Sequence, residues 1–188
     1  PNPNPNPRPN PNANPIANPN PPRDGHLSRI PAAGGKKNAK NSVPRNAATG
    51  KKVTASSEES NKGNLAKHAV DGDPTTRWCA ANSAPGSWLQ VDLGQAQDIQ
   101  NVRLIWEKAN GAYMYRIEGS LDAKNWKLLV DQSQNKDVRQ VTPHKVEANN
   151  TRYFKITYLG SKPAYWGSLW EFEAHTGSLP ELPRKVIK

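Results

Sequence analysis

The feature that most constrains the fold is a series of short apolar runs at close spacing, which begins near Asn46 and ends near Ala174. Glycine, asparagine, aspartate or proline separates each run from the next, and no segment carries the stripe of an amphipathic helix. The runs expected to form strands are 53–57, 88–93, 102–106, 114–118, 127–130, 138–141, 145–146, 152–158 and 168–174. Short, closely spaced strands of this kind predict an all-β domain, a β-sandwich with a core of adequate size.

Proline and asparagine dominate the chain before this region. Residues 1–22 repeat Pro-Asn almost without interruption, and residues 23–44 carry no sustained periodicity. Proline fixes φ and lacks an N–H donor, so such a segment favours extended polyproline II with nothing to bury. We therefore expect a low-complexity Pro-Asn and basic linker over 1–44, a folded domain over 45–177 and a C-terminal linker over 178–188. A recognition motif or a glycosylated stalk is the alternative for the N-terminal segment.

The net charge of +10 suggests a nucleic-acid partner until its distribution along the chain is considered. The first 44 residues carry six basic side chains and one acidic, and residues 178–188 carry three and one. Residues 45–177 are nearly balanced, with 17 basic and 14 acidic side chains. The folded part lacks the basic surface of a dedicated nucleic-acid-binding domain, so no nucleic-acid partner is expected.

Cysteine usage and hydropathy narrow the class of protein further. The single cysteine, Cys79, excludes a disulfide framework within the chain. The sequence has no apolar run of about 18 residues, so we expect no transmembrane segment. The chain begins without a signal peptide, which we interpret as the start of a mature product or of an excised fragment.

Residues 68–78 (His-Ala-Val-Asp-Gly-Asp-Pro-Thr-Thr-Arg-Trp) concentrate oxygen-bearing side chains in one loop. Ca²⁺ binds about six to eight oxygens from carboxylates, carbonyls and hydroxyls. Asp71, Asp73 and Thr76 can supply such oxygens, and the intervening glycine and proline bend the chain. The spacing is not that of an EF-hand loop. An ordinary turn, in which the aspartates accept backbone N–H bonds, remains the alternative at this point.

A set of short motifs in a characteristic order runs through residues 46–176. The motifs are Ala-Val-Asp-Gly-Asp (69–73), Thr-Arg-Trp (76–78), Trp-Leu-Gln-Val-Asp-Leu-Gly (88–94), Val-Arg-Leu (102–104), Tyr-Arg-Ile-Glu-Gly-Ser-Leu-Asp-Ala-Lys-Asn-Trp (115–126) and Ser-Leu-Trp-Glu-Phe-Glu (168–173). In these motifs the chain resembles the discoidin, or coagulation factor V/VIII type C (F5/8C), domains, and more closely their bacterial branch, the family 32 carbohydrate-binding modules. The resemblance implies a jelly-roll β-sandwich, galactose-binding-domain-like, with a structural Ca²⁺.

The same resemblance implies where that Ca²⁺ would be held. Its ligands would be the carbonyl of His68, the side chains of Asp71, Asp73 and Thr76, the carbonyl of Trp170 and the carboxylate of Glu171. The carboxylate from the last strand would then join the end of the domain to its beginning. Glu173, on the same side of that strand, is a substitute ligand or an ion-pair partner, and Arg77 is expected to form a structural ion pair.

Ligands of such modules are usually contacted by loops at one end of the sandwich. These loops correspond to residues 58–67, 79–87, 107–113, 131–137 and 160–167. A sugar site needs a flat apolar face beside hydrogen-bonding groups. The candidate ligand-binding residues are Trp106, Lys108, Asn110, Tyr113, Tyr165 and Trp166, with Asn82 and Lys162 as further polar candidates. A solvated loop residue is the alternative for the polar candidates, and a cap on the end of the sandwich for Tyr165 and Trp166.

The remaining aromatic side chains fit strand patterns and are expected in the core. They are Trp78, Trp88, Trp126, Phe154 and Phe172. Galactose-binding members of the family often have a histidine immediately after the Thr-x-Trp segment, where this chain has Cys79. That difference argues against specificity for galactose.

A catalytic function is not expected, because the histidines show no metal-ligand spacing and no serine, histidine and aspartate form a recognisable catalytic pattern. The resemblance instead implies a non-catalytic, lectin-like module that binds carbohydrate, glycan or polysaccharide. It would be tethered in a larger secreted or cell-surface protein, extracellular and bacterial. The alternative is a cell- or matrix-adhesion module on the same fold without a sugar site. Phospholipid binding ranks lower, since the loops 58–67 and 131–137 have polar tips.

Overall fold

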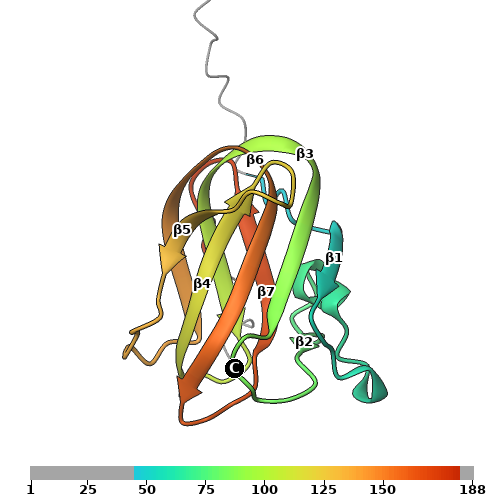
Figure 1. The fold of residues 1–188 in the computed structure, drawn as a ribbon, viewed down its shortest axis with the longest axis vertical. Helices are drawn as coiled ribbons and strands as arrows, with labels where there is room; N and C mark the ends of the chain where they lie inside the picture. Colours follow the sequence, from blue (N-terminus) through green and yellow to red (C-terminus); the bar gives the residue numbers. More distant parts are fainter. Residues whose placement is uncertain (1–44, 183–188) are drawn as a thin grey trace, which may run out of the picture. The chain divides into compact units, whose positions relative to one another are not determined.

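The computed structural model describes residues 45–182; the predicted linker over 1–44 and the last six residues of the predicted C-terminal linker lie outside them. The strands are β1 (Lys52–Ala55), β2 (Trp78–Cys79), β3 (Trp88–Trp106), β4 (Ala112–Ser120), β5 (Lys127–Asp131), β6 (Val141–Lys162) and β7 (Ser168–His175). Two short 3₁₀ helices, η1 (Ser60–Lys62) and η2 (Ala66–Val70), precede β2. The expectation of an all-β domain is confirmed (Figure 1).

Two long strands build both layers of the sandwich. The first part of β3, residues 88–92, pairs with residues 153–157 of β6, and its second part, 97–105, pairs with residues 141–151. The register shifts between the two parts, and both strands bend over at the top of Figure 1. Strands that cross from one sheet to the other at a bulge form the corners of a sandwich. The order β2-β7-β3-β6-β4-β5 is therefore one antiparallel sheet folded onto itself.

The remaining strands extend the two layers. β1 pairs with the first part of β3, and β4 and β5 extend the layer from the late part of β6. β7 pairs with the second part of β3, and β2 pairs with β7. The sequence predicts separate strands where β3 and β6 are continuous, because turn-forming residues such as Gly94 interrupt the apolar pattern. Gly94 has a φ of 84°, which glycine adopts without strain, and the strand resumes after it.

The core lies between the two layers. Phe154 of β6 and Phe172 of β7 meet across it with ring centroids 5.7 Å apart, and Trp78 is also buried, as expected. Trp88 and Trp126 are only half-buried. Trp126 lies on the outer surface under the ammonium group of Lys155, whose Nζ is 4.3 Å from the ring centroid. Aromatic residues in strand patterns thus serve both the interior and the outer face.

The two ends of the folded domain lie side by side. Asn46 forms a β-bridge with His175, and the N–H of Ala47 donates to the carbonyl of Ala174 at 2.7 Å. The segment after β7 is fastened to β3, since Arg103 Nη1 donates to the carbonyl of Pro180 at 2.7 Å. Among the described residues, no helix is long and apolar enough to cross a membrane.

Candidate functional site

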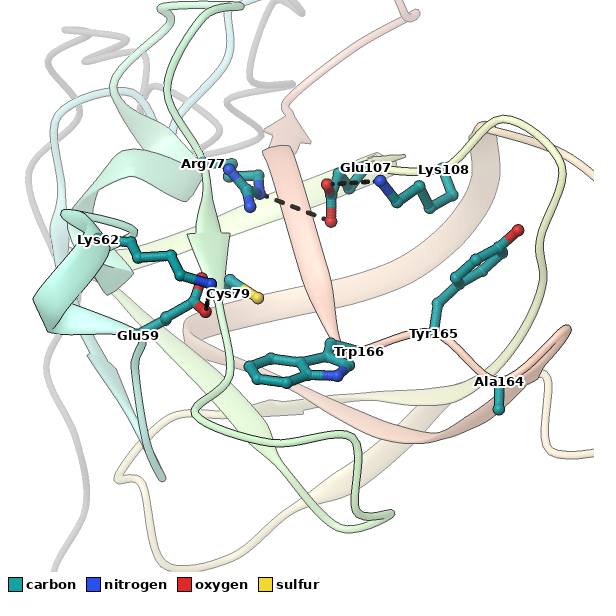
Figure 2. A pocket seen from close by; sticks show the side chains of 9 residues that line it. All are labelled: Glu59, Lys62, Arg77, Cys79, Glu107, Lys108, Ala164, Tyr165 and Trp166. Carbon is teal, nitrogen blue, oxygen red and sulfur yellow. Dashed lines mark hydrogen bonds and ion pairs between the residues drawn. The ribbon is translucent and has the colours of Figure 1, made fainter.

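A hollow of about 310 Å³ opens where β3 ends and β7 begins (Figure 2). Four of the five loops expected to contact a ligand contribute to it; the loop 131–137 does not. The lining residues are Glu59, Lys62, Arg77, Cys79, Glu107, Lys108, Ala164, Tyr165 and Trp166. The fold thus brings together side chains that are more than 100 residues apart in the chain.

Two aromatic side chains of the β6–β7 loop line one side of the hollow. Trp166 is 39% exposed, and Figure 2 shows its indole across the hollow from the charged residues. Tyr165 is half-buried, and its hydroxyl donates to Asn110 Oδ1 at 3.0 Å. The loop is held from within, because Tyr158 Oη donates to the carbonyl of Tyr165 at 2.6 Å and Ser161 Oγ accepts the N–H of Tyr165 at 2.8 Å. The exposed indole therefore stands on a fixed backbone.

A buried carboxylate lies on the opposite side of the hollow. The side chain of Glu59 is only 8% exposed, and its Oε1 accepts a hydrogen bond from Lys62 Nζ at 2.7 Å. Its Oε2 accepts one from Asn64 Nδ2 at 2.6 Å. These bonds, first from Lys62 and then from Asn64, lower the pKa of Glu59 below its ordinary value. Glu59 is accordingly ionised at neutral pH and faces the hollow as an acceptor.

A second carboxylate, Glu107, lies at the end of β3. Lys108 Nζ is 3.0 Å from its Oε1, and Arg77 Nε is 3.6 Å from its Oε2. Arg77 also donates to Asn64 Oδ1 at 3.0 Å and to Ser168 Oγ at 3.2 Å. Arg77 is therefore a fixed cation between two carboxylates, as its predicted role in a structural ion pair requires. The hollow thus combines the apolar ring face of Trp166 with two carboxylate acceptors, Glu59 and Glu107, which neighbouring side chains hold in position.

Cys79 lies at the floor of this hollow. Its side chain is buried, it forms no disulfide, and burial raises the pKa of its thiol. A buried thiol with a raised pKa is a poor nucleophile. The position immediately after the Thr-Arg-Trp segment is thus occupied by a small buried thiol.

The structure places two of the candidate ligand-binding residues in the interior instead. Trp106 and Tyr113 are 0% and 1% exposed, and their rings stack 4.2 Å apart at 7°. Trp106 is the last residue of β3 and continues the inward face of Val102 and Leu104, so it is not a loop residue. The hydroxyl of Tyr113 accepts the N–H of Lys108 at 3.1 Å, which supports the loop from below. Neither ring has a face on which a sugar can stack.

The other candidates lie at or beside the hollow. Lys108, Tyr165 and Trp166 line it, and Asn110 contacts it through the hydroxyl of Tyr165. Sequence reasoning did not select Glu59, Lys62 or Glu107. In sequence Glu59 and Lys62 look like ordinary charges of a polar loop, and Glu107 looks like the outward residue of a strand. Only the folded arrangement shows that they face one cavity.

The predicted calcium ligands come together in part. Asp71 Oδ2 accepts a hydrogen bond from Thr76 Oγ1 at 2.8 Å, and Glu171 Oε1 accepts the N–H of Gly72 at 2.6 Å. Asp71 also lies close enough to Glu171 to act on its carboxyl group. Burial, together with Asp71, raises the pKa of Glu171 to about 8, against the opposing effect of the Gly72 N–H. Two acidic groups in contact need a proton or a cation between them.

The third predicted carboxylate has a different role in this arrangement. Asp73 Oδ1 accepts the N–H and the hydroxyl of Thr75 at 2.8 and 2.6 Å, which is the turn that the sequence leaves as an alternative. Within residues 45–182, no three His, Cys, Asp or Glu side chains form a metal-binding group. Asp71, Glu171 and the Thr76 hydroxyl nevertheless fit a hard cation, with carbonyls completing its shell.

Glu173 lies near the predicted calcium ligands in the sequence, and His68 is one of them through its carbonyl. Glu173 Oε2 is 2.6 Å from Arg103 Nη2 and 2.7 Å from His175 Nε2, so it forms the ion pair that the sequence offered as one of two roles. His68 lies in η2, and its buried Nδ1 has no hydrogen-bond partner among the described residues.

Comparison with known proteins identifies the family. The model of the F5/8 type C domain matches residues 52–172. The chain belongs to this family. Among solved structures, this F5/8 type C domain is similar to chitosan-binding module 1 of a chitosanase/glucanase from Paenibacillus sp. IK-5. The two are 32% identical with a TM-score of 0.62, over 69% of this chain and 98% of that one.

Two further similar proteins are a carbohydrate-binding module and a polysaccharide lyase family protein. The family 32 carbohydrate-binding module of AlyQ, solved with 4,5-unsaturated mannuronic acid, is 25% identical with a TM-score of 0.56, over 65% of this chain and 92% of that one. The polysaccharide lyase 8 family protein HylA of Enterococcus faecalis (strain ATCC 700802 / V583) is 30% identical over 125 residues. The match covers 62% of this chain and 9% of HylA. The expected resemblance to family 32 modules is thereby confirmed.

Proposed function

We propose that this F5/8 type C domain is a non-catalytic carbohydrate-binding module whose sugar site is the hollow beside Trp166. The observation that carries this proposal is the exposed indole of Trp166 opposite two recessed carboxylates, Glu59 and Glu107, each paired with a lysine. An exposed aromatic face with a few fixed polar groups suits a sugar ring, which has an apolar C–H face and polar edges.

Binding in this site combines stacking with hydrogen bonding. The pyranose ring lies on the indole of Trp166, and its hydroxyl or amino groups donate to Glu59 and Glu107. Arg77 pairs with Glu107 and donates to Asn64, and Asn64 in turn donates to Glu59. The hollow is shallow, so a single site binds weakly, and tethering beside a second binding or catalytic unit raises the effective affinity.

The carboxylates favour a sugar that carries amino groups. A carboxylate accepts a strong, charge-assisted hydrogen bond from an ammonium group. The similarity to a chitosan-binding module, at 32% identity over 69% of this chain, supports the same class of ligand. We therefore propose a polymer of amino sugars as the ligand. Galactose is disfavoured because Cys79 occupies the position of the histidine.

A structural Ca²⁺ at Asp71, Thr76 and Glu171 is a further part of the proposal, with Asp73 and the carbonyls of His68 and Trp170 as additional ligands. The contact between Asp71 and the buried Glu171 supports it, since a divalent cation would relieve the repulsion between them. The ion would stabilise the domain and takes no part in binding the sugar.

The setting we propose is a module of a larger bacterial protein, secreted or on the cell surface. Relatives from Paenibacillus and Enterococcus, which belong to polysaccharide-active proteins, support this. A cell- or matrix-adhesion module on the same fold is the second candidate, and it predicts no sugar binding at the hollow.

The test is an array of glycans and polysaccharides, followed by titration calorimetry on the ligands that bind. Trp166→Ala should lower the affinity at least tenfold with an unchanged unfolding temperature. Trp126→Ala is the matched control, because Trp126 is also a partly exposed tryptophan but does not line the hollow. An array without any binding, or equal losses in the two variants, would favour the adhesion alternative.

A further inference from the structure

The cations of the hollow are of two kinds. Arg77 is recessed, with a side chain 24% exposed, and it contacts Asn64, Ser168 and Glu107. Lys62 and Lys108 approach from the solvent side, with side chains 65% and 46% exposed. Arg77 is therefore a fixed part of the site, whereas each lysine is a largely solvent-exposed chain whose ammonium group reaches a carboxylate.

Each of these lysines covers one of the two carboxylates. Lys62 Nζ lies 2.7 Å from Glu59 Oε1, and Lys108 Nζ lies 3.0 Å from Glu107 Oε1. The carboxylates are much less exposed than the lysines, at 8% and 19%. The ammonium groups thus occupy the positions from which a ligand would reach these oxygens. Figure 2 shows both lysine side chains directed at the carboxylates that they cover.

We infer that Lys62 and Lys108 are displaceable counter-ions that set the charge of the sugar accepted by the site. This inference rests on the proposed function and deepens it. In the free domain, the lysines neutralise Glu59 and Glu107. An amino sugar replaces each lysine ammonium with its own, and the freed lysine moves into the solvent.

Displacement is energetically feasible because the lysine pairs are weak. Ion pairs with one long, solvent-exposed partner contribute little to stability, since the side chain loses entropy and water screens the charges. A carboxylate that is left buried without a cation is much less favourable. The site therefore exchanges one cation for another, and a sugar without a cationic group cannot make that exchange.

The same arrangement resists uncharged sugars and gives acidic sugars a second way to bind. An N-acetylated sugar offers no ammonium, so the lysines stay on the carboxylates. A uronic acid can pair with the lysines themselves once they turn outward. Removal of the lysines should therefore shift the preference of the site in a direction that depends only on the charge of the sugar.

The experiment measures the affinity of the full chain for chitotriose, its fully N-acetylated form and trigalacturonic acid by titration calorimetry. Lys62→Gln and Lys108→Gln should each strengthen chitotriose binding about two- to fivefold, because the competitor is lost. Binding of the N-acetylated trisaccharide should change little. If the wild-type chain binds trigalacturonic acid, the two lysine variants should bind it more weakly.

Two controls separate this effect from net charge and from folding. Lys124→Gln removes the same charge from the turn after β4, a lysine that does not line the hollow, and should leave all three affinities unchanged. Glu59→Gln should weaken chitotriose binding, and Lys62→Gln added to it should have no further effect, because its partner carboxylate is gone.

The outcomes distinguish this inference from the proposed function. A wild-type chain that binds none of the three sugars overturns both. A wild-type chain that binds chitotriose, with lysine variants that bind it equally or more weakly, overturns the counter-ion role alone. Tighter binding of all three sugars in the lysine variants also contradicts it, since charge selectivity would then be absent.

Discussion

Trp106 and Trp166 show that one residue type has two roles at the same end of the sandwich. Trp106 is fully buried against Tyr113 and Tyr115, and its Nε1 donates to Thr142 Oγ1 at 3.3 Å. Trp166, in contrast, presents an exposed face to the hollow. The position of each ring relative to its strand, rather than its chemistry, decides whether it stabilises the fold or is left accessible at the hollow.

Trp106→Ala should therefore act on stability. Truncation of a buried tryptophan removes apolar contacts and leaves a cavity, which costs about 3–5 kcal/mol. Urea unfolding followed by circular dichroism measures this loss. A variant with wild-type stability but no sugar binding would instead support the sequence-based prediction that Trp106 contacts the ligand.

The sequence is sufficient for part of the residue-scale assignment. The alternation of Val102, Leu104 and Trp106 already indicates one common face, and that face is the interior. It cannot show that Glu59 and Glu107 face the same hollow, because their proximity depends on contacts between strands that are distant in sequence. Charged residues of a loop look alike until their neighbours are known.

At the scale of elements, the corner where β3 and β6 change sheets is held by an ion pair. Arg152 donates from Nε and Nη2 to the two carboxylate oxygens of Asp92, at 2.7 and 2.9 Å. These bonds lower the pKa of Asp92 below its ordinary value of 3.8, and the N–H of Gly94 adds to the effect. A bidentate arginine–carboxylate pair is the geometry in which a surface ion pair contributes most.

This pair predicts an acid dependence of stability. The pKa of Asp92 is lower in the folded than in the unfolded state, so its contribution is present above pH 3.8 and is lost as the pH falls through the lowered value. Asp92→Asn should lower stability by about 0.5–1 kcal/mol at pH 7 and reduce the slope of stability against pH in the acid range.

Urea titrations between pH 2 and 7 test the prediction. Asp137→Asn, an exposed aspartate in the β5–β6 loop, is the control. An unchanged slope of stability against pH in Asp92→Asn would mean that the backbone hydrogen bonds alone hold the corner.

The sequence identifies the strands on both sides of this corner but not their continuity, because the apolar pattern stops at Gly94 while the hydrogen-bonded ladder does not.

At the scale of the whole molecule, Glu171 ties the loop before β2 to the last strand. Its Oε1 accepts the N–H of Gly72, which lies 99 residues earlier. If a Ca²⁺ is held there, Ca²⁺ should raise the unfolding temperature of the wild-type domain, because an ion bound only by the folded state stabilises it. Glu171→Gln should abolish that response.

Differential scanning calorimetry with Ca²⁺ or with EDTA measures this effect. Glu173→Gln is an informative comparison: Glu173 pairs with Arg103 and His175, so this variant should lose stability but keep its response to Ca²⁺. A wild-type domain with the same unfolding temperature in Ca²⁺ and in EDTA would contradict the calcium site.

The family motifs predict the architecture well, yet they do not show the turn-capping role of Asp73.

The neighbouring positions of Asn46 and His175 also determine how the domain responds to traction. The hollow lies at the other end of β7, about 23 Å away at the usual rise per residue. After His175 the chain turns back, so that Pro180 and Leu182 line a pocket with Ile105 and Glu171, and Arg103 holds the carbonyl of Pro180. Tension on the C-terminal flank would therefore act first on the bonds that hold this returning segment, from Asn101 to the Gly177 carbonyl and from Arg103 to the Pro180 carbonyl, before it reached the Asn46–His175 bridge. A load transmitted from a bound polymer to one flank would instead run along the length of β7. The last strand and the segment that returns along it would thus share the traction of a polymer held at the hollow.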